Sequence, residues 1–242
     1  WNEAETQAEL ESNEKAIYRL DLNDKEILPE EIEDLLSYSK TRKVKDLRLD
    51  KNEFFDEGVS LLVEAPALQK LITLSLAHNK LSNQAVAALA SSAILVNLRK
   101  LFLQGNQIGV EGLKALVASE TLSNLQLLYL NLNPIGPEGA RILGGKGKVK
   151  QLEELYLQGT RLGEKGLQAL CESGNFKKLK LLSLAGNGLD DHAAELIYHS
   201  KAFPELNTLD LYHNKISDQA VDQLRASPNL PKLKALQVDW RS

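Results

Sequence analysis

The sequence predicts an α/β solenoid, with a parallel β-sheet on the concave face of a curved horseshoe arc and helices on the convex face. Two observations support this fold class. A Leu-x-Leu pair recurs every 27 residues, from Leu20/Leu22 to a ninth copy at Leu236/Val238. Each pair is followed by a polar bend and then by apolar residues at helical spacing. A fixed period of roughly 20 to 50 residues is the signature of a solenoid built from one repeated unit.

Each repeat is expected to begin with a short β-strand. An apolar residue opens the repeat, as Val44, Leu71 and Leu98 do, and the Leu-x-Leu pair follows. Alternation with period two is typical of a half-buried strand, because successive side chains point to opposite faces of a sheet. The residues between and beside the leucines should therefore face away from the core.

A bend marked by asparagine is expected after each strand. Lys25 and Thr160 replace the asparagine in two repeats. Six repeats have it: Asn52, Asn79, Asn106, Asn133, Asn187 and Asn214. Asparagine suits a bend because its side-chain amide can satisfy backbone groups that the strand ladder does not reach. Stacking of the repeats should place these amides above one another.

A helix is expected after each bend. Beyond Asn106, the apolar residues Ile108, Leu113 and Leu116 fall at helical spacing. Six residues beyond the bend position stands a small residue: Gly58, Ala85, Gly112, Gly139, Gly166, Ala193 and Ala220. A column of small residues lets consecutive helices approach closely. Because helices are wider than strands, the stack should curve with the helices outside.

We expect one elongated repeat domain over residues 17–242, with eight 27-residue repeats and a ninth terminal strand. Residues 1–16 lie outside the repeat and are rich in Glu, Ala and Gln. They predict a short amphipathic helix that caps the open end of the core, as terminal elements of solenoids do. An unstructured tail is the alternative.

The repeat resembles the ribonuclease-inhibitor-like class of leucine-rich repeats. The resemblance rests on Leu-x-x-Leu-x-Leu-x-x-Asn-x-Leu followed by a helix with a small residue and Leu-x-x-Leu, and it covers about residues 17–240. The segment from Ala226 to Leu230 is similar in style to bacterial members. The resemblance implies a non-catalytic module that binds a protein partner on its concave face.

Two alternatives to a simple binding module stay open. One branch of this class regulates enzymes, so the chain could be a GTPase activator. The chain could also be the recognition fragment of a larger bacterial effector or receptor, because it starts at Trp1, contains no methionine and stops at Ser242.

The composition favours a soluble monomer, in the cytoplasm or exported as a bacterial effector. The 242 residues are 43% hydrophobic and 26% charged, with a net charge of −4. No apolar run approaches the roughly 20 residues that a membrane-spanning helix needs, and no secretory leader is evident. The single cysteine, Cys171, cannot form an intrachain disulfide, which favours a reducing compartment.

No cofactor, metal or catalytic residue is expected. His78 and His213 occupy equivalent positions five repeats apart, hence roughly 24 Å at about 4.8 Å per strand. His192 and His199 share a helix but lack three convergent ligands. The glycine-rich segment 144–148 lacks the spacing of a phosphate loop and follows a helix, so it is interpreted as a helix C-terminal turn.

Charged residues of opposite sign gather at opposite ends of the helices. Acidic residues stand where helices begin, and lysines such as Lys146, Lys148 and Lys150 stand where helices end. Both placements complement the helix dipole, each contributing about a few tenths of a kcal/mol. We interpret the basic edge as structural and, because the protein is acidic overall, expect no nucleic-acid partner.

The residues between the paired leucines define a column across the predicted concave face. From the first strand to the ninth it contains Asp21, Arg48, Ser75, Phe102, Tyr129, Tyr156, Ser183, Asp210 and Gln237. Three neighbouring aromatic residues stand at its centre. An apolar cluster within a polar rim is typical of interaction sites, in which tyrosine is enriched.

We therefore predict a protein-binding site anchored on Phe102, Tyr129 and Tyr156. Neighbouring positions complete it: Lys100, Gln104, Leu127, Asn131, Leu132, Glu154, Gln158, Leu181 and Tyr212. The alternative is that the aromatic residues merely stabilise an open sheet as cross-strand pairs.

Overall fold

The computed structural model describes residues 19–37 and 39–239, and it is organised around one nine-stranded parallel sheet. The strands lie side by side in sequence order, so each pairs only with its neighbours in the chain. They are β1 (Arg19–Asp21), β2 (Asp46–Arg48), β3 (Thr73–Ser75), β4 (Lys100–Phe102), β5 (Leu127–Tyr129), β6 (Glu154–Tyr156), β7 (Leu181–Ser183), β8 (Thr208–Asp210) and β9 (Ala235–Gln237). The predicted α/β solenoid is confirmed.

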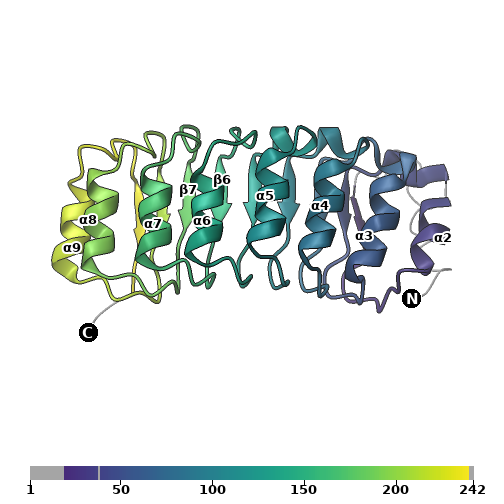
Figure 1. Cartoon of the computed structure of the whole chain (residues 1–242), viewed down its shortest axis with the longest axis horizontal. Coiled ribbons are helices and arrows are strands. Elements are labelled where there is room, and N and C mark those ends of the chain that lie inside the picture. The colour runs from purple at the N-terminus through teal and green to yellow at the C-terminus, as the bar shows by residue number, and fades with distance from the viewer. Residues whose placement is uncertain (1–18, 38, 240–242) are drawn as a thin grey trace.

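The α-helices form a row along one face of the sheet, as Figure 1 shows. They are α2 (Glu31–Ser37), α3 (Phe55–Glu64), α4 (Asn83–Ser91), α5 (Val110–Ala118), α6 (Gly136–Gly144), α7 (Gly163–Cys171), α8 (Asp191–His199) and α9 (Asp218–Arg225). Short 3-10 helices follow some of them at Ser39–Lys43, Pro66–Leu68, Leu95–Asn97 and Thr121–Asn124. We call the helical side convex and the opposite sheet face concave. The predicted cap at residues 1–16 lies outside the described residues.

The strand register follows the 27-residue period without a slip. Leu74 pairs with Leu101, which is aligned with Leu128 on the next strand. These leucines are fully buried, and they continue into one core that runs through all the repeats. Because a slip of one residue would turn every leucine outward, this core fixes which side chains reach the concave face.

The predicted asparagine column forms a buried hydrogen-bond ladder. Asn106 Nδ2 donates to the Leu103 carbonyl at 2.9 Å and to the Leu76 carbonyl of the preceding repeat at 3.0 Å. Asn106 Oδ1 accepts from the backbone N–H groups of Asn79 and Leu81 at 2.9 and 3.1 Å. Each amide therefore joins two repeats at a bend where the three-residue strands have ended.

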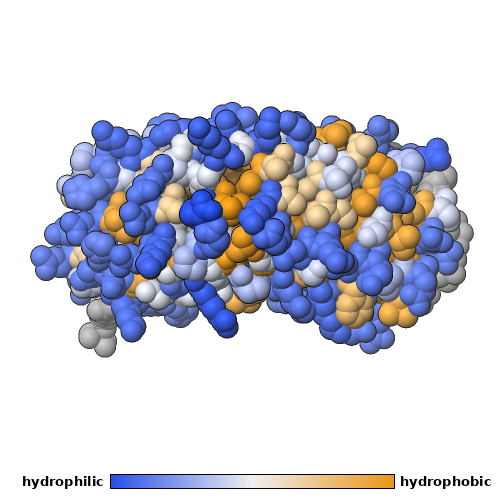
Figure 2. All heavy atoms as spheres, in the orientation of Figure 1, coloured by the Kyte–Doolittle hydropathy of each residue, from blue (hydrophilic) through white to orange (hydrophobic). Residues whose placement is uncertain are grey.

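The small residues let the helices pack closely, as predicted. A Cβ at Gly139 would lie 2.6 Å from Ile135 Cγ2 and 2.9 Å from Leu113 Cδ1 of the preceding repeat. A Cβ at Gly166 would come similarly close to Ala140 Cβ, at 3.0 Å. The outer surface of this helical layer is mostly hydrophilic, with hydrophobic patches between helices (Figure 2). The helices cover one face of the sheet, so the side chains that remain available on the sheet itself are those of the concave face.

Candidate functional site

Three aromatic side chains stack across the centre of the concave face. The register aligns Phe102 on β4, Tyr129 on β5 and Tyr156 on β6. The ring centroids of Phe102 and Tyr129 are 4.8 Å apart with planes inclined by 23°, and those of Tyr129 and Tyr156 are 3.8 Å apart at 12°. All three side chains remain half-buried. The predicted anchors are thus brought together as one continuous strip, which we call the aromatic strip.

The last ring of the aromatic strip is held by a carboxylate on its own strand. Tyr156 Oη donates to Glu154 Oε2 at 3.0 Å. Burial, the neighbouring Tyr129 side chain and the Glu154 carboxylate raise the pKa of Tyr156 above its ordinary value. Each of these factors disfavours a tyrosinate anion, so the hydroxyl stays protonated and keeps donating to Glu154.

Amide side chains border the aromatic strip where the strands end. Asn131 Oδ1 accepts from the backbone N–H of Gln158 at 3.1 Å, which ties two neighbouring repeats together. Gln104 Oε1 is buried and accepts no hydrogen bond from any described residue. A buried acceptor without a partner is unfavourable by about 1 to 3 kcal/mol. Lys100, on the other border, is exposed and forms no ion pair within the described part of the chain.

The four remaining residues of the predicted site differ in exposure. Leu132 is 58% exposed, beside the aromatic strip at the end of its strand. Leu127 is only 8% exposed, so it is covered by neighbouring side chains of the concave face, while Leu181 is half-buried. Tyr212 is 38% exposed but follows β8, two strands beyond Gln158, hence about 10 Å away. The structure thus separates Tyr212 from the rest of the predicted residues.

Leu132 also has a left-handed backbone conformation, which the leucine and asparagine columns alone do not predict. Its φ is +57°, in the left-handed region that β-carbon sterics disfavour. Every repeat from the first to the eighth has this conformation one residue before the bend position: Asp24, Lys51, His78, Gly105, Leu132, Gly159, Gly186 and His213. The three glycines were the available sequence signal. Leu132 is the only aliphatic side chain in this column.

The N-terminal part of the concave face has a different chemistry. Asp46 accepts from Arg19 Nε at 2.8 Å and from Arg48 Nε at 3.2 Å. Asp50 Oδ1 accepts from the Ala77 backbone N–H at 2.8 Å and from the Ser75 hydroxyl. Polar side chains here bind one another and the backbone.

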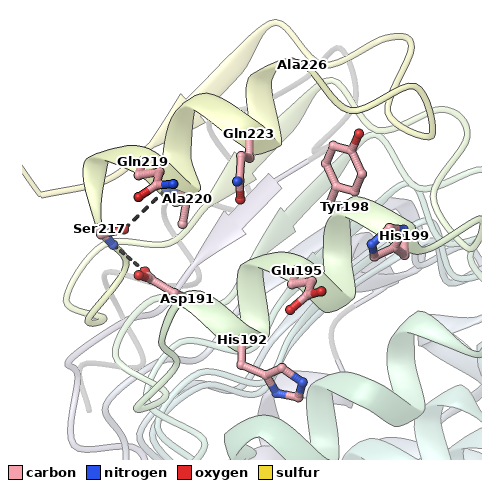
Figure 3. Close-up of a pocket in the computed structure, with 10 residues that line it drawn as sticks. All are labelled: Asp191, His192, Glu195, Tyr198, His199, Ser217, Gln219, Ala220, Gln223 and Ala226. Atoms are coloured by element: carbon pink, nitrogen blue, oxygen red, sulfur yellow. Dashed lines mark hydrogen bonds between the residues drawn. The ribbon is translucent and has the colours of Figure 1, made fainter.

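A hollow on the convex side lies between α8 and α9 (Figure 3). His192 and His199 belong to its lining, and each already contacts a neighbouring side chain. His192 Nδ1 is 3.0 Å from Glu164 Oε1 of α7, and the His199 ring packs edge-on against Tyr198 with centroids 4.9 Å apart. Among the described residues, no three His, Cys, Asp or Glu side chains form a cluster suited to a metal ion. The hollow is therefore a weaker candidate for a functional site than the aromatic strip.

Cys171, at the end of α7, is half-buried. Burial raises the pKa of its thiol to about 12, and the Glu172 carboxylate adds to this shift. The thiolate is the nucleophilic form of cysteine, so this thiol is suited to packing and not to catalysis.

The fold and the aromatic strip define a class of repeat protein in which a rigid parallel sheet displays side chains from successive units. Four consecutive repeats, at residues 67–90, 95–117, 121–143 and 151–171, match the family model described as leucine-rich repeat. These four units are leucine-rich repeats, and the same 27-residue period continues on both sides of them. A search of the curated proteins found no match.

Leucine-rich repeats generally mediate protein–protein interactions, and the family is typically non-catalytic. Within the described residues, no helix combines the length and the apolar character that a bilayer span requires.

Proposed function

We propose that this chain is a non-catalytic interaction module that holds a protein partner on its concave face. The aromatic strip of Phe102, Tyr129 and Tyr156 supplies the anchors, and Leu132 extends their apolar surface. Lys100, Gln104, Asn131, Glu154 and Gln158 form the polar rim. This arrangement matches the usual anatomy of an interface, in which a few aromatic anchors carry most of the binding energy within a polar border.

The observation that favours binding over a purely structural role is Leu132. Cross-strand pairing can account for stacked rings, because neighbouring aromatic residues stabilise a sheet. It does not account for an aliphatic side chain that is 58% exposed at φ +57°. The bend imposes the left-handed conformation on every repeat, so the fold explains the φ but not the presence of an exposed leucine, for which this conformation is unfavourable by about 1 kcal/mol or more. A partner that covers Leu132 supplies the missing stabilisation.

The unpartnered Gln104 Oε1 supports the same conclusion. This acceptor lies on the concave face beside Phe102 and is buried from water without a hydrogen-bond donor. A partner that donates an N–H group to it would remove an unfavourable term from the free protein.

Replacing Tyr129 and Tyr156 together with alanine tests the proposal. Loss of a hot-spot side chain weakens binding by about 2 kcal/mol or more, so recovery of specific partners should collapse. The measurement is quantitative mass spectrometry of proteins captured from a lysate of the source organism. Tyr198→Ala is a matched control, because Tyr198 is a partly buried tyrosine on the convex side.

Captured proteins should be retained by the control and lost by the double variant, with circular dichroism confirming that both remain folded. Equal recovery by the wild type and the double variant would contradict the concave-face assignment.

A further inference from the structure

The C-terminal part of the concave face is acidic. Across the described stretch from β6 to β9, the concave positions include Glu154, Asp210 and Asp239 but neither lysine nor arginine. On β1 and β2, by contrast, Arg19 and Arg48 neutralise Asp46. The charge on this half of the face is therefore a property of particular residues and not of the repeat template.

Two of these carboxylates are oriented by neutral groups. Glu154 accepts from the Tyr156 hydroxyl at 3.0 Å. Asp210 Oδ2 accepts from Ser183 Oγ at 2.6 Å, and its Oδ1 accepts from the Tyr212 backbone N–H at 3.1 Å. Neither carboxylate lies within ion-pair distance of a Lys, Arg or His side chain in the described part of the chain. Both carboxylates are thus held in position by neutral donors and not by a cation.

Two of the basic groups near this half of the face are already engaged. Lys180, which precedes β7, pairs with Glu153 at 2.6 Å. His213 lies 3.5 Å from Asp239, the carboxylate at the far end of the face. A cation from a partner would therefore form its most favourable ion pairs at Glu154 and Asp210.

A tyrosine ring accompanies each of these two carboxylates. Tyr156 stands beside Glu154 in β6, and Tyr212, 38% exposed, follows Asp210. Arginine fits such a pair better than lysine, because its planar guanidinium can stack on an aromatic ring while donating to a carboxylate. Stacking and a charge-assisted hydrogen bond are then available to one side chain.

We propose that the partner presents an arginine-bearing segment to this half of the concave face, with one guanidinium at Glu154 and Tyr156 and a second at Asp210 and Tyr212. This inference rests on the proposed function. The two carboxylates stand two strands apart and are offset by two residues along the strands, because Glu154 is level with Thr208. Their separation is therefore about 12 Å, which an extended segment spans with about four residues. The partner is thus a basic peptide segment crossing the sheet toward β9.

Selection from a phage library of random dodecapeptides tests the inference. The wild-type protein is the bait, and each selected peptide is retested by fluorescence anisotropy against Glu154→Gln, Asp210→Asn and Tyr129→Ala. Glu111→Gln is the matched control, since Glu111 is an exposed carboxylate on α5, on the helical side of the sheet. Citrulline, a neutral analogue of arginine, replaces each arginine of the best peptide in turn.

We expect peptides with two arginines separated by a few residues. Each citrulline substitution, and each of Glu154→Gln and Asp210→Asn, should weaken binding about ten-fold, since a charge-assisted hydrogen bond is lost. Glu111→Gln should change it less than about two-fold.

The outcomes separate this inference from the proposed function. Peptides that need Tyr129 but contain no basic residue would overturn the arginine inference and leave the concave binding site standing. Basic peptides that bind Glu154→Gln and Asp210→Asn as well as the wild type would overturn the inference too. If no selected peptide loses affinity for Tyr129→Ala, both proposals fail.

Discussion

The first three strands and the central three strands occupy equivalent places in the repeat but use their concave positions differently. On β1 to β3, Asp46 binds two arginines, and Asp50 holds a hydroxyl and a backbone N–H of the next repeat. On β4 to β6, three rings stack with half-buried faces, while Gln104 Oε1 stays without a partner.

The difference shows that one backbone template can serve two purposes. The leucines and asparagines are common to both regions and fix the fold, so the side chains between them are free to vary. Where these side chains bind one another, they contribute to stability. Where they leave exposed apolar surface and an unpaired acceptor, they are available to a partner. Four substitutions test this division.

Asp50→Ala should have the largest effect on stability, lowering the free energy of unfolding by about 2 kcal/mol. The Asp50 carboxylate accepts from the Ala77 backbone N–H and the Ser75 hydroxyl, and both donors would lose their acceptor. Urea unfolding followed by circular dichroism measures the change. Asp21→Ala is the control, because Asp21 is exposed and accepts only from the backbone of Asn23, so it should change stability by less than about 0.5 kcal/mol. Equal changes in the free energy of unfolding for the two variants would contradict the idea that the hydrogen bonds of Asp50 stabilise the N-terminal region.

Tyr156→Phe should lower stability by about 1 kcal/mol near pH 7, because the hydrogen bond to Glu154 is lost. It should also change the pH dependence. The folded-state pKa of Tyr156 is raised, while an unfolded tyrosine ionises near pH 10. The stabilisation is therefore fully present below about pH 10 and declines as the pH rises further, since only the unfolded chain readily loses the proton.

Urea midpoints measured between neutral pH and about pH 11 check this prediction. The wild type should lose stability more steeply than Tyr156→Phe above about pH 10, and parallel curves would contradict the assigned cause.

Leu132→Asn should raise stability by about 0.5 to 1 kcal/mol and weaken partner binding. Asparagine tolerates the left-handed conformation that leucine adopts at φ +57°, and little buried surface is lost from a side chain 58% exposed. Leu28→Asn is a matched control, because Leu28 is also exposed, at 41%, but lacks the positive φ. It should show no gain. A loss of stability on Leu132→Asn would mean that this leucine serves the fold.

The fold could be predicted from the sequence because it depends on periodic constraints. The 27-residue interval fixes the register, the Leu-x-Leu pair fixes the buried face, and the asparagine marks the bend. Each of these features is repeated up to nine times, so a single deviation such as Thr160 does not obscure the pattern. The structure keeps Thr160 buried, with its hydroxyl donating to the Leu157 carbonyl at 2.8 Å.

The candidate site could be predicted only in part. The alignment of Phe102, Tyr129 and Tyr156 follows directly from the register, but their exposure and partners do not. Leu127 has the same concave orientation as Lys100 yet is buried, because exposure depends on the size of neighbouring side chains. The unpaired Gln104 Oε1 arises from local three-dimensional geometry, which a sequence column does not encode. The positive φ of Leu132 was signalled only by the glycines at equivalent positions of other repeats.

Arg19→Gln should have the smallest effect, lowering stability by less than about 0.5 kcal/mol. The Arg19 side chain is 61% exposed, and exposed ion pairs contribute little because water screens them. Asp46, only 18% exposed, keeps Arg48 as a partner when Arg19 is removed. The double variant Arg19→Gln/Arg48→Gln should therefore lose more stability than the sum of the single variants, since only then is the less exposed carboxylate left without a cation. No measurable loss in the double variant would mean that Asp46 does not depend on either arginine. The N-terminal region would then resemble the central one, with polar side chains that the fold itself does not require.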